Sequence, residues 1–198
     1  MRQMTDFEFK IFCSGVNTCD DSFLDRLFEA GCGDATVFFK DGYVCLDFTR
    51  ESENAESAVV SAIEDLERSD IGGTVERVEP EDLASLSEIA TRVGVTRASL
   101  QKYARGESKV GKDFPAPVQN ISLARRELYS TVEVMRWMLQ KKKSNISSHY
   151  LDLCTVIAKT NQALMVSRAK NDEFVSRLVA RLTAPIQPEE TCHIQQKP

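Results

Sequence analysis

The side chains best suited to bind another molecule gather in residues 96–105. Arginine and glutamine can each make paired hydrogen bonds with the edge of a DNA base, and lysine offers a compact positive charge to phosphate. If this stretch forms a helix, these side chains lie on its outer face: Thr96, Arg97, Ala98, Gln101, Lys102 and Arg105. The pattern predicts contact with DNA. The alternative is an ordinary helical hairpin whose basic face is solvated.

Two short helices joined by a tight turn are predicted to hold this face in place. Ser85 and Glu88 have the spacing of a capping box, which starts a helix. Gly94 can adopt the left-handed conformation that ends the first helix, and Thr96 can cap the second. Leu100 would then pack against the first helix. The spacing therefore predicts a helix-turn-helix, although such units also serve as protein docking modules.

A β-hairpin and a further helix are predicted to complete this part of the chain. Two short strands, residues 118–122 and 127–129, flank a turn that carries Arg125 and Arg126. These arginines could contact phosphates or the minor groove beside the helix-turn-helix. Exposed loop arginines with no such role are the alternative. The helix that follows contains Trp137, which is expected to close the core of a winged helix-turn-helix.

The first 79 residues follow a different pattern. Apolar and polar residues alternate in segments 7–13, 35–48 and 74–78, as expected of strands with one buried face, and the second segment contains an Asp-Gly hairpin signal. Segments 22–30 and 51–69 have the apolar periodicity of amphipathic helices. The order strand, helix, strand, strand, helix, strand predicts an α+β, ferredoxin-like βαββαβ domain with an antiparallel sheet.

Beyond residue 144 the sequence predicts a long helix. Apolar residues recur at spacings of three and four, which is typical of a helix that pairs with another helix. The predicted dimerisation residues are Ile146, Tyr150, Leu153, Ile157, Leu164, Phe174 and Leu178. A helix folded back on its own domain is the alternative. The predicted organisation is an acidic domain at 1–79, a winged helix-turn-helix at 80–143, a dimerising helix at 144–184 and a disordered tail at 185–198.

Charge is distributed unevenly along the chain. Residues 1–80 contain 18 Asp or Glu and 7 Lys or Arg, whereas residues 81–143 contain 12 Lys or Arg and 7 Asp or Glu. Phosphate attraction is therefore expected from the helix-turn-helix, with the acidic first third pointing away from DNA.

The sequence carries no motif that indicates an enzyme. We find no nucleophile–base pair, metal motif or phosphate loop, so we expect no catalytic residue, metal or cofactor. The six cysteines include no Cys-x-x-Cys pair and are expected to be reduced and mostly buried. No apolar run is long enough to span a bilayer, and the start of the chain lacks the apolar segment of a signal peptide. These features predict a cytoplasmic, nucleoid-associated protein with no membrane partner.

Residues 86–139 resemble the winged helix-turn-helix of the MerR and excisionase-like family of bacterial DNA-binding proteins. The resemblance is carried by SLSEIATRVGVTRASLQKYARG, by FPAPV and by RRELYSTVEVMRWML. It implies that the second helix enters the major groove, that the wing touches the DNA backbone and that a C-terminal helix makes a dimer. The paired cysteines of MerR-type metal sensors are not matched here, so the resemblance does not imply metal sensing.

Two functions follow as hypotheses. The first is a dimeric, sequence-specific transcriptional regulator that binds double-stranded DNA and senses a ligand or partner through its N-terminal domain. The second is an antitoxin or adaptor of a toxin–antitoxin or phage-defence operon. Such a protein would bind the product of a neighbouring gene and regulate its own operon through the helix-turn-helix.

Overall fold

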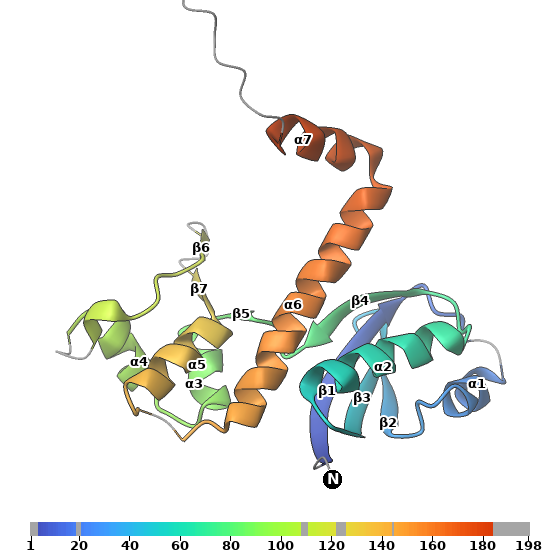
Figure 1. Ribbon diagram of the computed structural model, residues 1–198, viewed down its shortest axis with the longest axis horizontal. Coiled ribbons are helices and arrows are strands. Elements are labelled where there is room, and N and C mark those ends of the chain that lie inside the picture. Colours follow the sequence, from blue (N-terminus) through green and yellow to red (C-terminus); the bar gives the residue numbers. More distant parts are fainter. Residues whose placement is uncertain (1–3, 19–20, 108–110, 122–125, 144, 184–198) are drawn as a thin grey trace, which may run out of the picture. The chain divides into compact units, whose positions relative to one another are not determined.

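The computed structural model describes residues 4–18, 21–107, 111–121, 126–143 and 145–183 of the chain (Figure 1). It is a mixed α+β structure. The chain divides into two compact units, one ending at Leu164 and the other beginning at Met165, and each is described by itself.

A four-stranded antiparallel sheet forms the first part of the larger unit. Its strands are β1 (Thr5–Ser14), β2 (Ala35–Lys40), β3 (Tyr43–Ser52) and β4 (Thr74–Glu79), in the order β2-β3-β1-β4. Asp41 and Gly42 join β2 to β3 with φ angles of 52° and 83°. Positive φ at both positions is what the right-handed twist of a two-residue hairpin requires. The four strands, their antiparallel pairing and the Asp41-Gly42 turn are as predicted from the sequence.

Helices α1 (Phe23–Glu29) and α2 (Ala55–Arg68) pack with one face of the sheet into a single core. Alternate residues of β1 and β3 face this core, and α2 contributes a stripe of small and branched side chains. The members of the core with no measurable exposure include Ile11, Leu46, Phe48, Ala58, Val59, Ala62 and Val78. The helix predicted at 51–69 begins later, at Ala55, because β3 continues through Ser52 and the Asn54 side chain accepts a hydrogen bond from the Ser57 amide.

The buried side chain of Arg50 links several segments around this core by hydrogen bonds. Nε and Nη2 of Arg50 donate to the two carboxylate oxygens of Asp34 at 2.7 and 2.9 Å, and Nη1 donates to Asp65 at 2.8 Å. Nη2 also donates to the Gly31 carbonyl, and Nη1 to Ser61. Burial lowers the pKa of the guanidinium, but the hydrogen bonds and charges of the two carboxylates outweigh it and raise the pKa.

A smaller three-stranded sheet and three helices follow in the chain. They are β5 (Leu83–Ala84), α3 (Leu86–Arg92), α4 (Arg97–Ala104), β6 (Gln119–Ile121), β7 (Arg126–Ser130) and α5 (Thr131–Gln140), with a 3-10 turn at Gly111–Asp113. The strand order is β5-β7-β6. The two predicted hairpin strands are thus present, whereas β5 is too short to give a sequence pattern. Trp137 is 4% exposed in the core, as expected.

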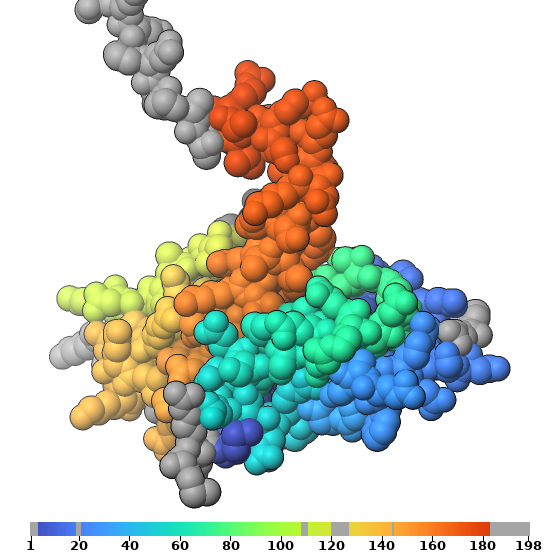
Figure 2. Space-filling model, turned by 45° about the vertical axis from the view of Figure 1, so that its right-hand side comes forward, coloured from blue at the N-terminus to red at the C-terminus, as the bar shows by residue number. Residues whose placement is uncertain are grey.

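Helix α6 (Ser148–Asn171) packs against both parts of the larger unit. Leu153 and Ile157 are buried in the core of the four-stranded sheet, and Cys154 packs with Val132 and Met135 of α5. The Asn161 side chain accepts a hydrogen bond from the Val78 amide and donates one to its carbonyl, each at 2.8 Å. In Figure 2 the orange stretch of α6 lies between the yellow segment that contains α5 and the green-to-blue N-terminal segments.

This packing corrects the dimerisation prediction at two positions. The spacing of Leu153 and Ile157 matches a helix pair and predicts a dimer seam. These residues are instead buried in the apolar core of their own chain, together with residues of the four-stranded sheet and α2. The spacing of apolar residues does not distinguish a partner helix from a neighbouring domain, since both require the same stripe.

The smaller unit contains the end of α6 and helix α7 (Glu173–Thr183). The long predicted helix is interrupted at Asp172, whose carboxylate accepts hydrogen bonds from the Phe174 and Val175 amides at 2.9 and 3.0 Å. Several apolar side chains of α7 are exposed, among them Phe174, Leu178, Val179 and Leu182. Within the described part of the chain, none of the helices is long and apolar enough to cross a membrane.

Candidate nucleic-acid interface

The corner between α3 and α4 is built from local interactions that the sequence encodes. The Ser85 hydroxyl accepts a hydrogen bond from the Glu88 amide, and the Glu88 carboxylate accepts one from the Ser85 amide at 2.8 Å, so the predicted capping box is formed. Gly94 has φ of 68° just after α3, as predicted. The Thr96 hydroxyl accepts from the Ser99 amide and starts α4. These contacts fix where each helix begins and ends.

The inner face of α4 is anchored in an apolar core. Leu100 has no measurable exposure and packs with Ile89 and Ala90 of α3. Tyr103 lies against Trp137, with ring centroids 5.1 Å apart, and Phe114 lies 5.0 Å from the same indole. Helix α4 therefore cannot roll about its axis without disrupting buried aromatic contacts.

The outer face of α4 carries the side chains that the sequence singled out. Arg97, Ala98, Lys102 and Arg105 are exposed, and Gln101 is half-buried. In the described part of the chain, Arg97 and Lys102 form no ion pair, and Arg105 lies 3.6 Å from Glu107. The helix thus presents cations and an amide to solvent, the groups that can hydrogen-bond base edges and phosphates.

Thr96 differs from the other predicted contact residues. Its hydroxyl already caps α4 and lies 2.8 Å from the Ser99 hydroxyl. Thr96 is exposed, but its main observed role is to start the helix.

The predicted wing is described only in part. Strands β6 and β7 pair in register from Gln119↔Leu128 to Ile121↔Arg126. The backbone of Arg126 therefore begins β7, whereas its side chain and the whole of Arg125 lie outside the described residues. Contact between these two arginines and DNA stays a prediction.

The predicted dimerisation residues fall in different environments. Ile146 and Tyr150 pack partly buried against the helices around α5, and Leu153 and Ile157 are buried as described above. Leu164 is half-buried, and Phe174 and Leu178 are 61% and 38% exposed. Pairing with a second chain therefore stays a prediction for the positions near and within α7.

A hollow of about 750 Å³ beside the α3–α4 turn brings together cations that the sequence interpretation does not assign to binding. Arg92, Lys142 and Lys143 line it, with Tyr150 and the turn residues Gly94 and Val95. From sequence, the three lysines at 141–143 indicate only favourable charges at a helix end. The sequence also has Lys142 where a glycine commonly follows a helix, which marks this helix end as unusual.

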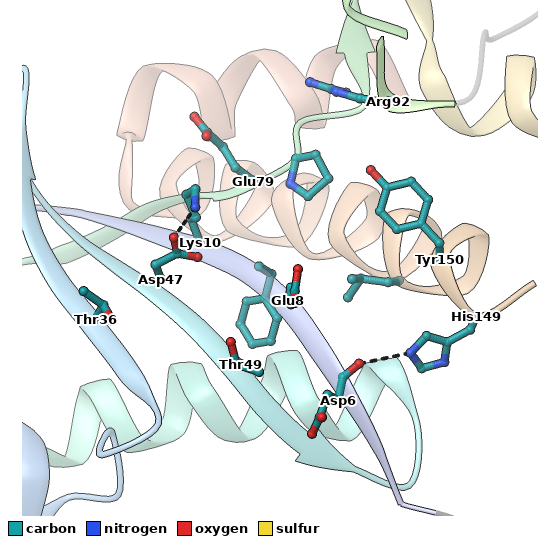
Figure 3. A pocket seen from close by; sticks show the side chains of 13 residues that line it. Asp6, Glu8, Lys10, Thr36, Asp47, Thr49, Glu79, Arg92, His149 and Tyr150 are labelled. Carbon is teal, nitrogen blue, oxygen red and sulfur yellow. Dashed lines mark hydrogen bonds and ion pairs between the residues drawn. The ribbon is translucent and has the colours of Figure 1, made fainter. Parts of the chain in front are cut away.

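A second hollow, of about 780 Å³, lies over the face of the four-stranded sheet away from α1 and α2 (Figure 3). Lys10 points toward Asp47 and forms an ion pair with it, and the His149 ring lies 3.3 Å from the Asp6 carbonyl oxygen. Its charges are mixed: Lys10 and Arg92 line it together with the carboxylates of Asp6, Glu8, Asp47 and Glu79. This arrangement favours neither sign of ligand charge.

The described thiols are buried, and burial raises the pKa of each. Cys13, Cys32, Cys45 and Cys154 are free and buried, as predicted, while Cys19 and Cys192 lie outside the described residues. Burial is the main cause that raises the pKa of Cys13 to about 12 and that of Cys154 to about 11. A thiol with such a pKa is a poor nucleophile near neutral pH.

Comparison with known proteins gives no relative for this chain: no family model matches it, and no match is found among curated proteins or solved structures.

Proposed function

We propose that this protein is a dimeric, sequence-specific DNA-binding regulator of transcription that inserts α4 into the major groove. The observation that carries the proposal is the two-sided character of α4, with Leu100 and Tyr103 in the core and Arg97, Lys102 and Arg105 in solvent. An α-helix with its side chains is about 10–12 Å across, which matches the roughly 12 Å width of the major groove.

The arrangement of the other elements supports this proposal. The α3–α4 corner followed by the β6–β7 hairpin and α5 is consistent with a winged helix-turn-helix of the MerR and excisionase-like kind. The strand order β2-β3-β1-β4, with α1 and α2 in one shared core, supports a ferredoxin-like N-terminal domain. In the proposed regulator this acidic domain senses a ligand or partner and reports through α6, which packs against both parts of the larger unit.

Self-association is assigned to α7 in this proposal. Phe174, Leu178 and Leu182 recur every fourth residue and are 61%, 38% and 83% exposed. An isolated helix of 11 residues is marginal in water, so covering this stripe stabilises it. Two copies packed antiparallel would place Glu173, at the start of one helix, near Arg181, at the end of the other.

The same exposed stripe supports a second candidate function, that of an antitoxin or adaptor. In this case α7 packs on a different protein, such as the product of a neighbouring gene, and DNA binding serves autoregulation. Co-expression with neighbouring genes distinguishes the two candidates. A complex of fixed stoichiometry that replaces the homodimer favours the adaptor, and a homodimer unchanged by co-expression favours the regulator.

Selection from a random duplex library tests the proposed function. The purified protein is expected to enrich inverted repeats, because half-site spacing mirrors the symmetry of a dimer. The Arg97→Ala/Lys102→Ala variant is expected to bind the enriched duplex about 30-fold or more weakly, since a base-reading arginine alone contributes about 1–3 kcal/mol.

A matched control separates base contact from bulk charge. Lys159 and Lys170 are exposed on α6. The Lys159→Ala/Lys170→Ala variant therefore removes two positive charges, as the α4 variant does, but at another place. This control variant is expected to retain nearly full affinity for the enriched duplex. Equal losses in both variants, or unchanged binding by the α4 variant, would contradict the assignment of α4.

A further inference from the structure

The hollow beside the α3–α4 turn is cationic. Arg92 comes from the end of α3, Lys142 and Lys143 follow α5, and Tyr150 lies in the first turn of α6. Among its described lining residues, which also include Val93, Gly94, Val95, Asn145, Ile146 and Ser147, there is no carboxylate. Three positive charges without a negative one in a hollow of about 750 Å³ favour an anionic ligand.

The backbone at the end of α5 fixes where these lysines lie. The Lys142 amide donates to the Leu139 carbonyl at 3.0 Å, and the Lys143 amide donates to the Met138 carbonyl at 2.9 Å. These two hydrogen bonds form a Schellman motif, with Lys142 at its left-handed position and φ of 53°. Both lysines are therefore held on a rigid helix end.

Most helices of the larger unit have glycine at the left-handed position that follows them. Helices α1, α3 and α4 end with the same pair of hydrogen bonds and have Gly31, Gly94 and Gly106 at the left-handed position. Glycine adopts positive φ without the steric cost that a Cβ brings. After α2, Asp70 also has a positive φ, of 50°. The left-handed residue after a described helix of the larger unit is therefore glycine in three cases and not glycine at Asp70 and Lys142, and the Lys142 side chain lines the hollow.

The remaining polar groups suit an anion as well. Nη1 of Arg92 donates to the Glu81 carbonyl at 2.6 Å and to the Thr131 hydroxyl at 3.1 Å, which pins the guanidinium at the edge of the hollow. The pKa of Tyr150 is raised to about 12, mainly by burial and to a smaller extent by the nearby Cys154, so its phenol keeps its proton. The start of α6, with the partial positive charge of a helix N-terminus, lies on the same side.

We propose that this hollow binds a phosphate group, held by Lys142, Lys143 and Arg92. For a phosphate of the DNA backbone the inference rests on the proposed function, because Gly94 and Val95 lead directly into α4 and place the hollow beside the groove that α4 would occupy. A free polyphosphate would use the same charges.

The Lys142→Gly/Lys143→Ala variant tests the proposal without weakening the fold. Glycine suits the φ of residue 142, so the helix end is retained or stabilised. Duplex affinity is measured against salt for an enriched and an unrelated sequence. If the phosphate is from DNA, the variant weakens binding to both sequences alike, and its log–log salt slope is shallower by about 0.9 for each phosphate that it no longer neutralises.

In the second part of the test, the binding of sodium triphosphate to the wild type and to the variant is measured by titration calorimetry at low salt. Triphosphate that binds the wild type at least tenfold more tightly than the variant supports a free polyphosphate ligand. This part does not depend on DNA binding, so it remains decisive if the wild type binds no duplex. Lys159→Ala/Lys170→Ala controls for net charge in both parts. An unchanged salt slope together with equal triphosphate affinities overturns the proposal.

Discussion

Replacing Ile157 by alanine is expected to destabilise the larger unit by about 3 kcal/mol. Ile157 has no measurable exposure and lies in the core formed by the four-stranded sheet, α2 and α6. Removing its three outer carbon groups costs about 2.4 kcal/mol in transfer free energy, at about 0.8 kcal/mol for each group. The cavity left behind adds to this, within the range of about 2–5 kcal/mol seen for such substitutions.

Urea unfolding at two protein concentrations is the assay. The midpoint for Ile157→Ala should fall by roughly 1–2 M, for a slope of about 2 kcal/mol per M, and the shift should not depend on protein concentration. Ile157→Val should cost about 1 kcal/mol, which gives a graded series at one site. Phe174→Ala provides the contrast, because this exposed residue should affect stability only through self-association.

A destabilisation below about 1 kcal/mol for Ile157→Ala would refute the packing of α6 on its own domain. A destabilisation that grows with protein concentration would also refute it. Such a result would support the original prediction that Ile157 contacts a second chain.

Other perturbations follow from buried groups. Arg50→Ala should cost about 3–5 kcal/mol in urea unfolding, because Asp34 and Asp65 lose their shared cation, whereas Arg68→Ala on the exposed side of Asp65 should cost less than about 1 kcal/mol. Stability should fall as the pH rises from about 9 toward 12, because burial raises the pKa of Cys13 from 9.0 to about 12 and only the unfolded thiol ionises in this window. Urea midpoints at about pH 8 and about pH 10.5 check this, and a flat profile would contradict it.

Much of the local structure follows from short-range rules. The turn at Asp41-Gly42, the capping box at Ser85 and the left-handed Gly94 each depend on residues close in sequence, and all three are observed. The antiparallel sheet of the first domain agrees with the prediction because alternation and helix spacing leave few ways to bury one face of each element.

The features that sequence reasoning missed depend on residues distant in sequence. The stripe on α6 predicts a partner helix, because periodicity does not identify the surface that the stripe meets. Asn161 gives no sequence signal, since its pairing with Val78 joins residues 83 positions apart. The cationic hollow likewise requires α3, the end of α5 and the start of α6 to meet. Its one sequence signal is the lysine in place of glycine at residue 142.

Directed cleavage of DNA from α4 tests the central claim most directly. Ala98, exposed on α4, is replaced by cysteine in a background with Cys19→Ser and Cys192→Ser, and the new thiol is coupled to iron–EDTA. The four described cysteines are buried, so labelling should be selective. Val60→Cys on α2, at a side chain that is 41% exposed, serves as the control. Strand breaks confined to the enriched site with the α4 label, and absent with the α2 label, are predicted; equal breakage from both labels, or none from α4, would contradict the account.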